Sequence, residues 1–365
     1  MQDETNALSV CLILVFEGMR MSDDRLKMPA ERDFGFYQRR KHDKWRAVPV
    51  PEPALESTVV DTHAHVHMLP DPAWELARCA ANGVTALCEI CDPSEDHLDP
   101  ASDIVRWQEQ CSAYLESELS LAPNSDDASI ALSEQESSAL GSTKSSVGAF
   151  LPSVRFCSGV HPHNARLYDS SIEKKLVNLL DCPLAVGLGE VGLDYYYDLS
   201  PRDVQRRVFR RQIALAKELE LPIALHLRGG DDPVADNAHR EAFEILSELG
   251  FPAKGTLLHC CALAPEELKP WIDAGCYIAY GGALTFKNSE EAREGARLVP
   301  EDRLLLETDS PYMTPEPMRG AACTPAHVVF TAARLAEVRG VAPGDSRRAF
   351  LDRLNANAHE LLSLL

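Results

Sequence analysis

Eight short runs rich in apolar and β-branched residues recur along the chain, with helical patterns between most of them. Each run is nearly continuous in hydrophobicity, as expected for a parallel strand buried on both faces. The runs cover residues 58–63, 84–91, 154–160, 184–190, 222–227, 255–260, 275–281 and 303–308. Eight strands that alternate with helices predict an α/β fold, namely a (β/α)8 TIM-like barrel.

The clearest helical pattern covers residues 201–219. Ser200 is a candidate cap, Pro201 suits the first helical position, and Asp203 completes a Ser-x-x-Asp box. The same segment holds five arginines, which form either a basic flank for a nucleic-acid backbone or a solvated face paired to local acids. They are Arg202, Arg206, Arg207, Arg210 and Arg211.

Two segments fall outside the alternating pattern. Residues 1–56 read as an N-terminal extension that we expect to be poorly ordered, with prolines near its end marking a linker into a barrel at 57–365. Residues 92–150 are largely an insertion between the second and third strands. A helix is predicted around 101–119, and the Ser-, Ala- and acid-rich stretch at 120–147 is expected to be disordered on the surface.

The net charge of −20 at first argues against a nucleic-acid partner, but its location changes that conclusion. Residues 92–136 contain twelve acids and a single base, Arg106, and so carry −11 of the total. The acidity is therefore concentrated in the insertion and does not describe the rest of the molecule.

Composition also bears on the compartment. The eleven cysteines show no disulfide-framework spacing, which favours a reducing environment, and Cys88-x-x-Cys91 lacks the second pair of a zinc ribbon. No apolar run is long enough to predict a membrane span, and the apolar segment 7–16 lacks the basic flank of a secretory signal. The basic cluster at 39–46 fits a nuclear signal or a solvated surface. We expect a cytoplasmic or nuclear protein.

Residues able to bind a metal stand at the ends of five predicted strands. His63 and His65 point to the same side of the first strand because side chains alternate along it. Taken alone, such a pair is as consistent with a structural role as with a metal site. Later strand ends add four more candidates, and the set is His63, His65, Glu190, His226, His259 and Asp309.

In a barrel of this kind, the carboxyl ends of the strands form one rim where catalytic groups lie. Four imidazoles and two carboxylates packed together without a metal would lose hydration with little return. One or two divalent cations, Zn²⁺, Mn²⁺ or Mg²⁺, would satisfy them. The sequence therefore predicts a metal centre at this rim.

The sequence resembles the TatD-type metal-dependent deoxyribonucleases of the amidohydrolase-like barrel superfamily. The resemblance runs from residue 59 to about 359 and excludes the extension and the insertion. Its motifs are modest singly but specific in this order. They lie at 61–65 (DTHAH), 159–163 (GVHPH), 189–197 (GEVGLDYYY), 221–228 (LPIALHLR), 258–260 (LHC), 305–312 (LLETDSPY) and 317–320 (PMRG).

The resemblance implies a role for each matching position. His63 and His65 match the first metal pair, Glu190 the carboxylate between two metals, and His226 with His259 the ligands of the second metal. Asp309 matches the final carboxylate, which would orient or deprotonate the attacking water. The implied activity is hydrolysis of DNA phosphodiester bonds by metal-activated water, from 3′ ends of single strands, with Glu190 and Asp309 as catalytic residues.

Other residues near the motifs have two readings each. His161 could contact a phosphate or brace a loop, and Arg228 could balance phosphate charge or pair with an acid. Asp194 could orient a ligand or begin a turn, and Glu307 could support a ligand or serve packing alone. No membrane or protein partner is indicated; the expected partner is DNA.

Three departures from the family pattern concern the substrate side of the rim. Cys261-Ala262-Leu263 and Cys323 replace the usual residues after two motifs, and Leu227 stands where a serine is common. The alternative function is hydrolysis of a C–N or ester bond, such as an amide or a D-aminoacyl-tRNA. A catalytically poor scaffold is a third reading, which the full set of six ligand-type residues argues against.

Overall fold

The computed structural model describes residues 34–39, 45–51, 57–95, 99–121 and 151–364. Its main feature is an eight-stranded parallel sheet in which every strand pairs with the next one along the chain. The strands are β3 (Val59–Ala64), β4 (Val84–Cys91), β5 (Ser153–Ser158), β6 (Ala185–Asp194), β7 (Ile223–Arg228), β8 (Thr256–Leu258), β9 (Tyr277–Tyr280) and β10 (Leu304–Leu306). Each coincides with one of the eight predicted runs.

The sheet closes between its first and last strands. Asp309 N–H donates to the His63 carbonyl at 2.9 Å, and His65 N–H donates to the Ser310 carbonyl at 2.8 Å. A parallel bridge between Ala64 and Ser310 completes the contact. The (β/α)8 TIM-like barrel is thereby confirmed, with the join placed beside three of the predicted ligands.

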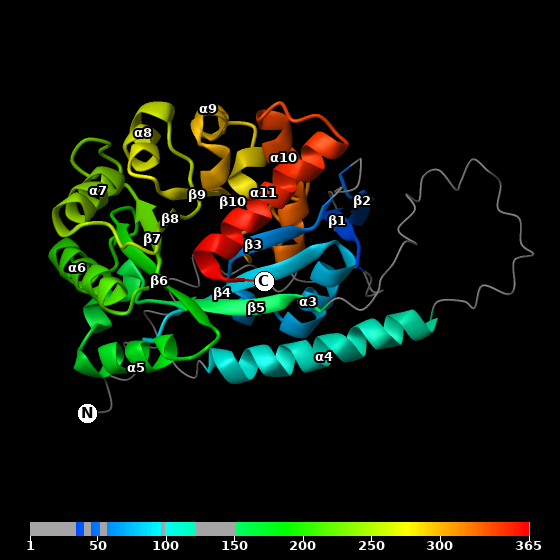
Figure 1. Cartoon of the computed structure of the whole chain (residues 1–365), viewed down its shortest axis with the longest axis horizontal. Helices are drawn as coiled ribbons and strands as arrows, with labels where there is room; N and C mark the ends of the chain where they lie inside the picture. Colours follow the sequence, from blue (N-terminus) through cyan, green and yellow to red (C-terminus); the bar gives the residue numbers. More distant parts are fainter. Residues whose placement is uncertain (1–33, 40–44, 52–56, 96–98, 122–150, 365) are drawn as a thin grey trace, which may run out of the picture.

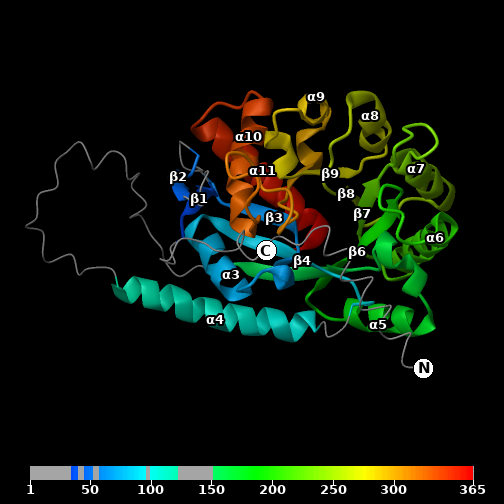
Figure 2. The same cartoon turned by 180° about the vertical axis from the view of Figure 1, so that it is seen from behind.

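Helices cover the outside of the strands, as Figures 1 and 2 show from opposite sides. They are α3 (Pro72–Ala81), α4 (Pro100–Leu121), α5 (Ser170–Leu180), α6 (Arg202–Glu218), α7 (Ala238–Leu249), α8 (Pro265–Asp273), α9 (Glu290–Leu298), α10 (Val328–Val338) and α11 (Asp345–Leu362). The helix predicted before the insertion is α4, which packs along α3. Residues 122–150, most of the predicted disordered stretch, lie outside the described part. Within that part, no helix is long and apolar enough to cross a membrane.

The amino-terminal end of the barrel is sealed by α11. Leu361 and Leu362 are buried against the barrel's interior residues, which are mostly small or medium-sized. Asn355 donates to the carbonyl of Thr58, just before β3, and Asn357 donates to that of Leu304 at the start of β10. With this end closed, polar groups can face an opening only at the carboxyl ends of the strands.

Part of the predicted N-terminal extension is folded, which corrects the expectation of poor order. Strands β1 (Phe36–Arg39) and β2 (Trp45–Val48) form an antiparallel hairpin. Phe36 is buried and packs on the rings of His327 and Phe330. The hairpin is held by side chains far along the sequence, so its local composition did not reveal it. Most of the basic cluster, residues 40–44, lies outside the described part.

The predicted cap of the best helix was also wrong. Helix α6 is preceded by Pro201, and no side chain caps it. The Ser200 hydroxyl instead donates to the His163 carbonyl at 2.7 Å and accepts from Arg166 N–H at 3.1 Å. Ser200 therefore braces the loop after β5, next to the candidate site.

Candidate metal centre

All six predicted ligand residues lie at the carboxyl end of the barrel. His63 is on β3 and His65 follows it; Glu190 is on β6 and His226 on β7. His259 comes directly after β8, and Asp309 lies three residues beyond the end of β10. Parallel strands bring these separate positions to one rim.

Glu190 occupies the middle of the cluster. Its Oε1 lies 2.9 Å from His226 Nδ1 and 3.0 Å from His259 Nε2, and its Oε2 lies 3.5 Å from His63 Nε2. Asp309 Oδ1 is 3.5 Å from His65 Nε2. One carboxylate thus faces histidines from three other strands, the position that a bridging ligand would occupy.

Charges in the cluster suit a cation. Burial raises the pKa of Glu190, but the imidazoles of His259 and His63 outweigh it, so the net pKa is well below the usual range. Burial also raises the pKa of Asp309, but a hydrogen bond from His65 and the nearby imidazoles outweigh it, so the net pKa is lowered. Burial and the neighbouring His259 lower the pKa of His63. Anionic carboxylates and a neutral imidazole are the protonation states in which these groups bind metal. Burial lowers the pKa of His65, His226 and His259, but the neighbouring carboxylates outweigh it and raise all three, so these rings would release a proton on binding a cation.

His63 supplies the test of whether a cation fits. The residue is fully buried, yet neither ring nitrogen has a hydrogen-bond partner. A buried nitrogen without a partner costs free energy that a coordinate bond would recover. Ligand atoms within 4.8 Å of one another form four groups among the described residues. Three lie within the six predicted ligands (His63, His65 and Glu190; His63, His259 and Asp309; Glu190, His226 and His259), and the fourth joins His226 to His161 and His163. The donor set fits divalent ions such as Zn²⁺ or Mn²⁺.

Asp194 combines both roles that the sequence left open. Its Oδ2 lies 3.0 Å from His226 Nε2 and 2.8 Å from His163 Nε2. Its Oδ1 accepts the backbone N–H groups of Tyr196 and Tyr197 and so begins the turn after β6. Burial raises its pKa, but the two histidine hydrogen bonds dominate and lower it. The carboxylate fixes the His226 ring from behind.

Glu307 supports His259 in a similar manner. Its Oε1 lies 3.4 Å from His259 Nδ1 and accepts the backbone N–H of Cys260 at 2.5 Å. Because the carboxylate is fully buried, it restrains the ring without reaching the opening. The sequence left open whether Glu307 supports a ligand or serves packing alone, and the structure shows that it supports His259.

Sequence reasoning missed two buried acids that shape the site. Asp61 accepts the N–H groups of His63 and Thr308 and the Thr308 hydroxyl, and it thereby ties β3 to the segment after β10. The two-residue spacing from His63 could have indicated it. Glu89 on β4 accepts from Val66 N–H and from the His67 ring, so it holds the loop that follows His65. Nothing local marks Glu89, because its partners lie more than twenty residues earlier, in the loop after β3.

His161 lies at the edge of the cluster. Its Nε2 is 4.0 Å from Glu190 Oε1, and its ring is 4.2 Å from that of His226. Its Nδ1 accepts the N–H of His163, so the ring also braces the loop. Burial, aided by His226, lowers the pKa of His161 well below its usual value. A neutral imidazole facing the cluster remains a candidate contact for substrate.

Arg228 extends beyond His226 on the same strand. Its guanidinium carbon lies 4.1 Å from the Tyr196 ring centroid and 4.8 Å from that of Tyr197. Among the described residues, no acid forms an ion pair with it, in contrast to the second reading of this residue. Its donors are therefore available to an anion at the rim.

The arginines of α6 behave differently. Four of the five pair with acids of neighbouring helices or loops: Arg202 with Asp236, Arg206 with Glu241, Arg210 with Glu248, and Arg211 with Glu173. Of the two interpretations of these arginines, the structure therefore supports a solvated face paired to local acids. Such a face offers little net positive charge to a nucleic acid.

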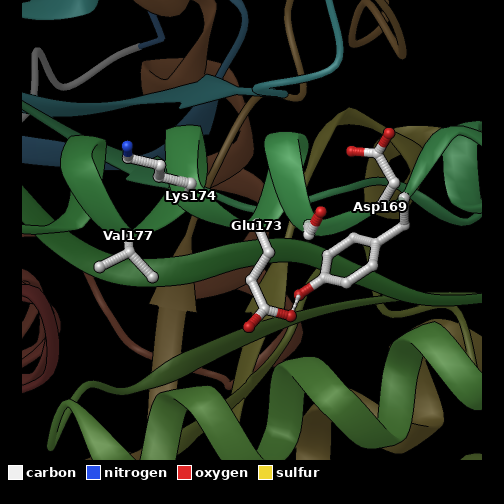
Figure 3. Close-up of a pocket in the computed structure, with 6 residues that line it drawn as sticks. Asp169, Glu173, Lys174 and Val177 are labelled. Atoms are coloured by element: carbon white, nitrogen blue, oxygen red, sulfur yellow. Dashed lines mark hydrogen bonds between the residues drawn. The ribbon is translucent and has the colours of Figure 1, made fainter.

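A shallow pocket beside α5 lies outside this centre (Figure 3). Its polar groups are used internally. Asp169 caps α5, and Glu173 accepts from the Tyr168 hydroxyl at 2.8 Å and from Arg211 at 2.7 Å. The pocket is explained by helix capping and ion pairing.

The departures from the family pattern affect packing behind the rim. Cys261, Leu263 and Cys323 are all buried. Burial raises the pKa of the Cys261 thiol to about 12, so it stays protonated. The other two departures are accessible to solvent, because Ala262 is exposed and Leu227 is half-buried.

A barrel with histidines and carboxylates converging at the carboxyl ends of its strands defines the class of metal-dependent barrel hydrolases. A family model described as TatD related DNase matches residues 60–362. The chain belongs to the TatD family.

Individual relatives agree with this assignment. A metal-dependent hydrolase of Bacillus subtilis, YabD, is 42% identical over 154 residues, covering 42% of this chain and 57% of that protein. The 3′-5′ ssDNA/RNA exonuclease TatD of Citrobacter koseri is 33% identical over 190 residues, covering 51% of this chain and 70% of that protein. The chain thus aligns with little more than half the length of the Bacillus relative.

The fold agrees as well. The crystal structure of the TatD homologue YjjV from Escherichia coli superposes with a TM-score of 0.61 at 20% identity, covering 84% of this chain and 98% of that one.

Proposed function

We propose that the protein hydrolyses phosphodiester bonds of DNA, removing nucleotides from the 3′ end of single strands with divalent metal ions as cofactors. The observation that carries this is the buried, partnerless His63 among two anionic carboxylates and three further imidazoles. The name of the Citrobacter relative supports the choice of a nucleic-acid substrate.

The ligand roles are those that the family resemblance implies, and the measured distances are compatible with them. His63, His65 and Asp309 would hold one cation, His226 and His259 a second, and Glu190 would lie between them. A divalent cation held by these residues would lower the pKa of a water molecule and stabilise negative charge on a phosphoryl oxygen. Mg²⁺, Mn²⁺ and Zn²⁺ are the candidates.

The remaining steps belong to side chains. Asp309 is anionic and faces the opening, so it can orient the attacking water and accept its proton. Arg228 can bind a phosphate oxygen through donors that no described acid uses, and neutral His161 can contact the same group. Asp194 and Glu307 keep the His226 and His259 rings in place.

The test uses 5′-labelled single-stranded DNA with Mg²⁺ or Mn²⁺, with and without EDTA. We expect a metal-dependent ladder of shortened products from the wild type and none from Asp309→Asn. The matched control is Asp302→Asn, because Asp302 is an exposed acid just before β10 whereas Asp309 follows that strand. Equal activity in wild type and Asp309→Asn would overturn the proposal. Hydrolysis of an amide or a D-aminoacyl-tRNA with DNA left intact would favour the C–N or ester alternative.

A further inference from the structure

Three consecutive tyrosines follow β6, and the structure divides them. Tyr195 is buried, and its hydroxyl donates to Glu241 at 2.6 Å. Tyr196 and Tyr197 are 53% and 36% exposed. Neither of their hydroxyls has a hydrogen-bond partner among the described residues. Two large aromatic rings thus remain accessible at the rim with no packing role that would explain them.

The two exposed rings are fixed relative to the metal centre. Asp194 Oδ1 accepts their backbone N–H groups at 3.0 and 2.8 Å, while Oδ2 of the same carboxylate contacts His226. The Tyr197 ring lies 5.4 Å from the His163 ring, which lies 6.0 Å from that of His226. A single ring, that of His163, therefore lies between Tyr197 and the candidate ligand His226.

The rings also adjoin an available positive charge. The two tyrosines stand perpendicular, with centroids 5.0 Å apart, and the Arg228 guanidinium lies against both. An arginine held on an aromatic face keeps the donors at its edge free for a phosphate. Aromatic surface beside a phosphate-binding cation is the combination by which proteins bind single-stranded nucleic acid.

We propose that Tyr196 and Tyr197 form a platform on which a base of single-stranded nucleic acid stacks, next to the phosphate bound by Arg228. The platform accepts any base because each has a π-face, and it excludes duplex because paired bases are not available. This inference rests on the proposed nuclease function and assigns to Tyr196 and Tyr197 the contact with an unpaired base that the function requires.

The test distinguishes the contribution of the aromatic ring from that of the tyrosine hydroxyl. Michaelis constants for 3′-end removal are measured for wild type, Tyr196→Leu and Tyr197→Leu, with Tyr196→Phe and Tyr197→Phe as matched controls. We expect the leucine variants to raise KM by about 5- to 100-fold with little change in kcat, and the phenylalanine variants to match wild type. A general structural defect would lower kcat and the melting temperature as well.

A second substrate locates the stacking partner. The same oligonucleotide carrying abasic sites near its 3′ end should raise KM for the wild type and cause no further rise in the leucine variants. If wild type degrades single strands but the leucine variants keep its KM, or if wild type ignores the abasic sites, the platform is wrong and the nuclease function stands. If wild type degrades no nucleic acid with any of the metals, both proposals fail.

Discussion

Two buried polar clusters in this molecule look alike in composition and differ in what their atoms contact. One is the candidate metal centre at the carboxyl ends of the strands. The other surrounds Arg78 on α3, beneath the N-terminal hairpin. Both are largely buried, and both contain histidine and a carboxylate.

The cluster around Arg78 largely satisfies itself. The guanidinium donates to Glu75 at 2.9 Å, to the Gly35 carbonyl at 2.9 Å and to Thr324 at 3.3 Å. His327 Nδ1 accepts the Thr324 N–H at 3.0 Å. The positive charge of Arg78 is balanced by its ion pair with Glu75. This cluster is therefore explained by its structural role, which is to attach the hairpin to the barrel.

The metal centre lacks such closure, because both nitrogens of His63 have no hydrogen-bond partner and its anionic carboxylates converge on one point. Burial of polar groups alone therefore does not mark a functional site. A single buried atom without a hydrogen-bond partner does not mark one either, since Arg78 Nε is such an atom. Anionic carboxylates that converge on ring nitrogens without hydrogen bonds do, because only a ligand would compensate the cost of burying them together. Exchanging single residues in each cluster can test this distinction.

The largest effect is expected from His63→Leu. Loss of a ligand should reduce hydrolysis by roughly 10³-fold or more. In metal-free protein, we expect the free energy of unfolding to stay equal or rise, because the change removes two partnerless buried nitrogens. Chemical denaturation in EDTA, beside the hydrolysis assay, measures both quantities. A marked loss of metal-free stability would mean that His63 has a structural role and would weaken the comparison.

Glu75→Gln should give the opposite pattern. Removing the partner of a buried guanidinium should cost about 2 to 3 kcal/mol of stability, with activity per folded molecule unchanged. Chemical denaturation and kcat/KM at a temperature where the variant is folded provide the measurements. Glu109→Gln, at an exposed acid on α4, is a control that should leave both quantities near wild type. Loss of activity in folded Glu75→Gln would show that the two clusters are coupled.

Asp194→Asn tests the support behind His226. We expect metal affinity to fall by about 10- to 100-fold, because the ring loses its anionic partner while every proposed ligand remains. Titration of activity with Mn²⁺ should show a higher half-saturating concentration and recovery at excess metal. A defect that excess Mn²⁺ leaves unchanged would indicate a role other than metal binding.

The last prediction concerns the pH dependence of stability. Burial and the nearby Arg78 lower the pKa of His327 to about 3, so the folded protein keeps this ring neutral. Between pH 6.5 and 3, the unfolded chain binds the extra proton, and stability falls as the pH falls, by at most about 1.4 kcal/mol per unit. Denaturation of His327→Gln over this range should show a shallower decline than wild type. An equal slope would assign the pH dependence to other groups.

The pattern of residues along the chain determined the barrel and the six candidate ligands. Strands buried on both faces must be continuously apolar, which made all eight visible. Parallel topology then places their carboxyl ends together, so His63, Glu190 and Asp309 could be grouped without coordinates. The helix before the insertion was also evident from its local sequence.

Only the tertiary structure decided how polar side chains are partnered. Ser200 looked like a helix cap and braces another loop, Asp194 holds two histidines, and the arginines of α6 pair with acids up to 38 residues away. The hairpin at β1 and β2 depends on Phe36 finding His327 and Phe330. The periodicity of the sequence predicts which face of a helix or strand a residue occupies. A hydrogen bond also depends on which atoms from distant parts of the chain lie next to that face, and only the tertiary structure shows them.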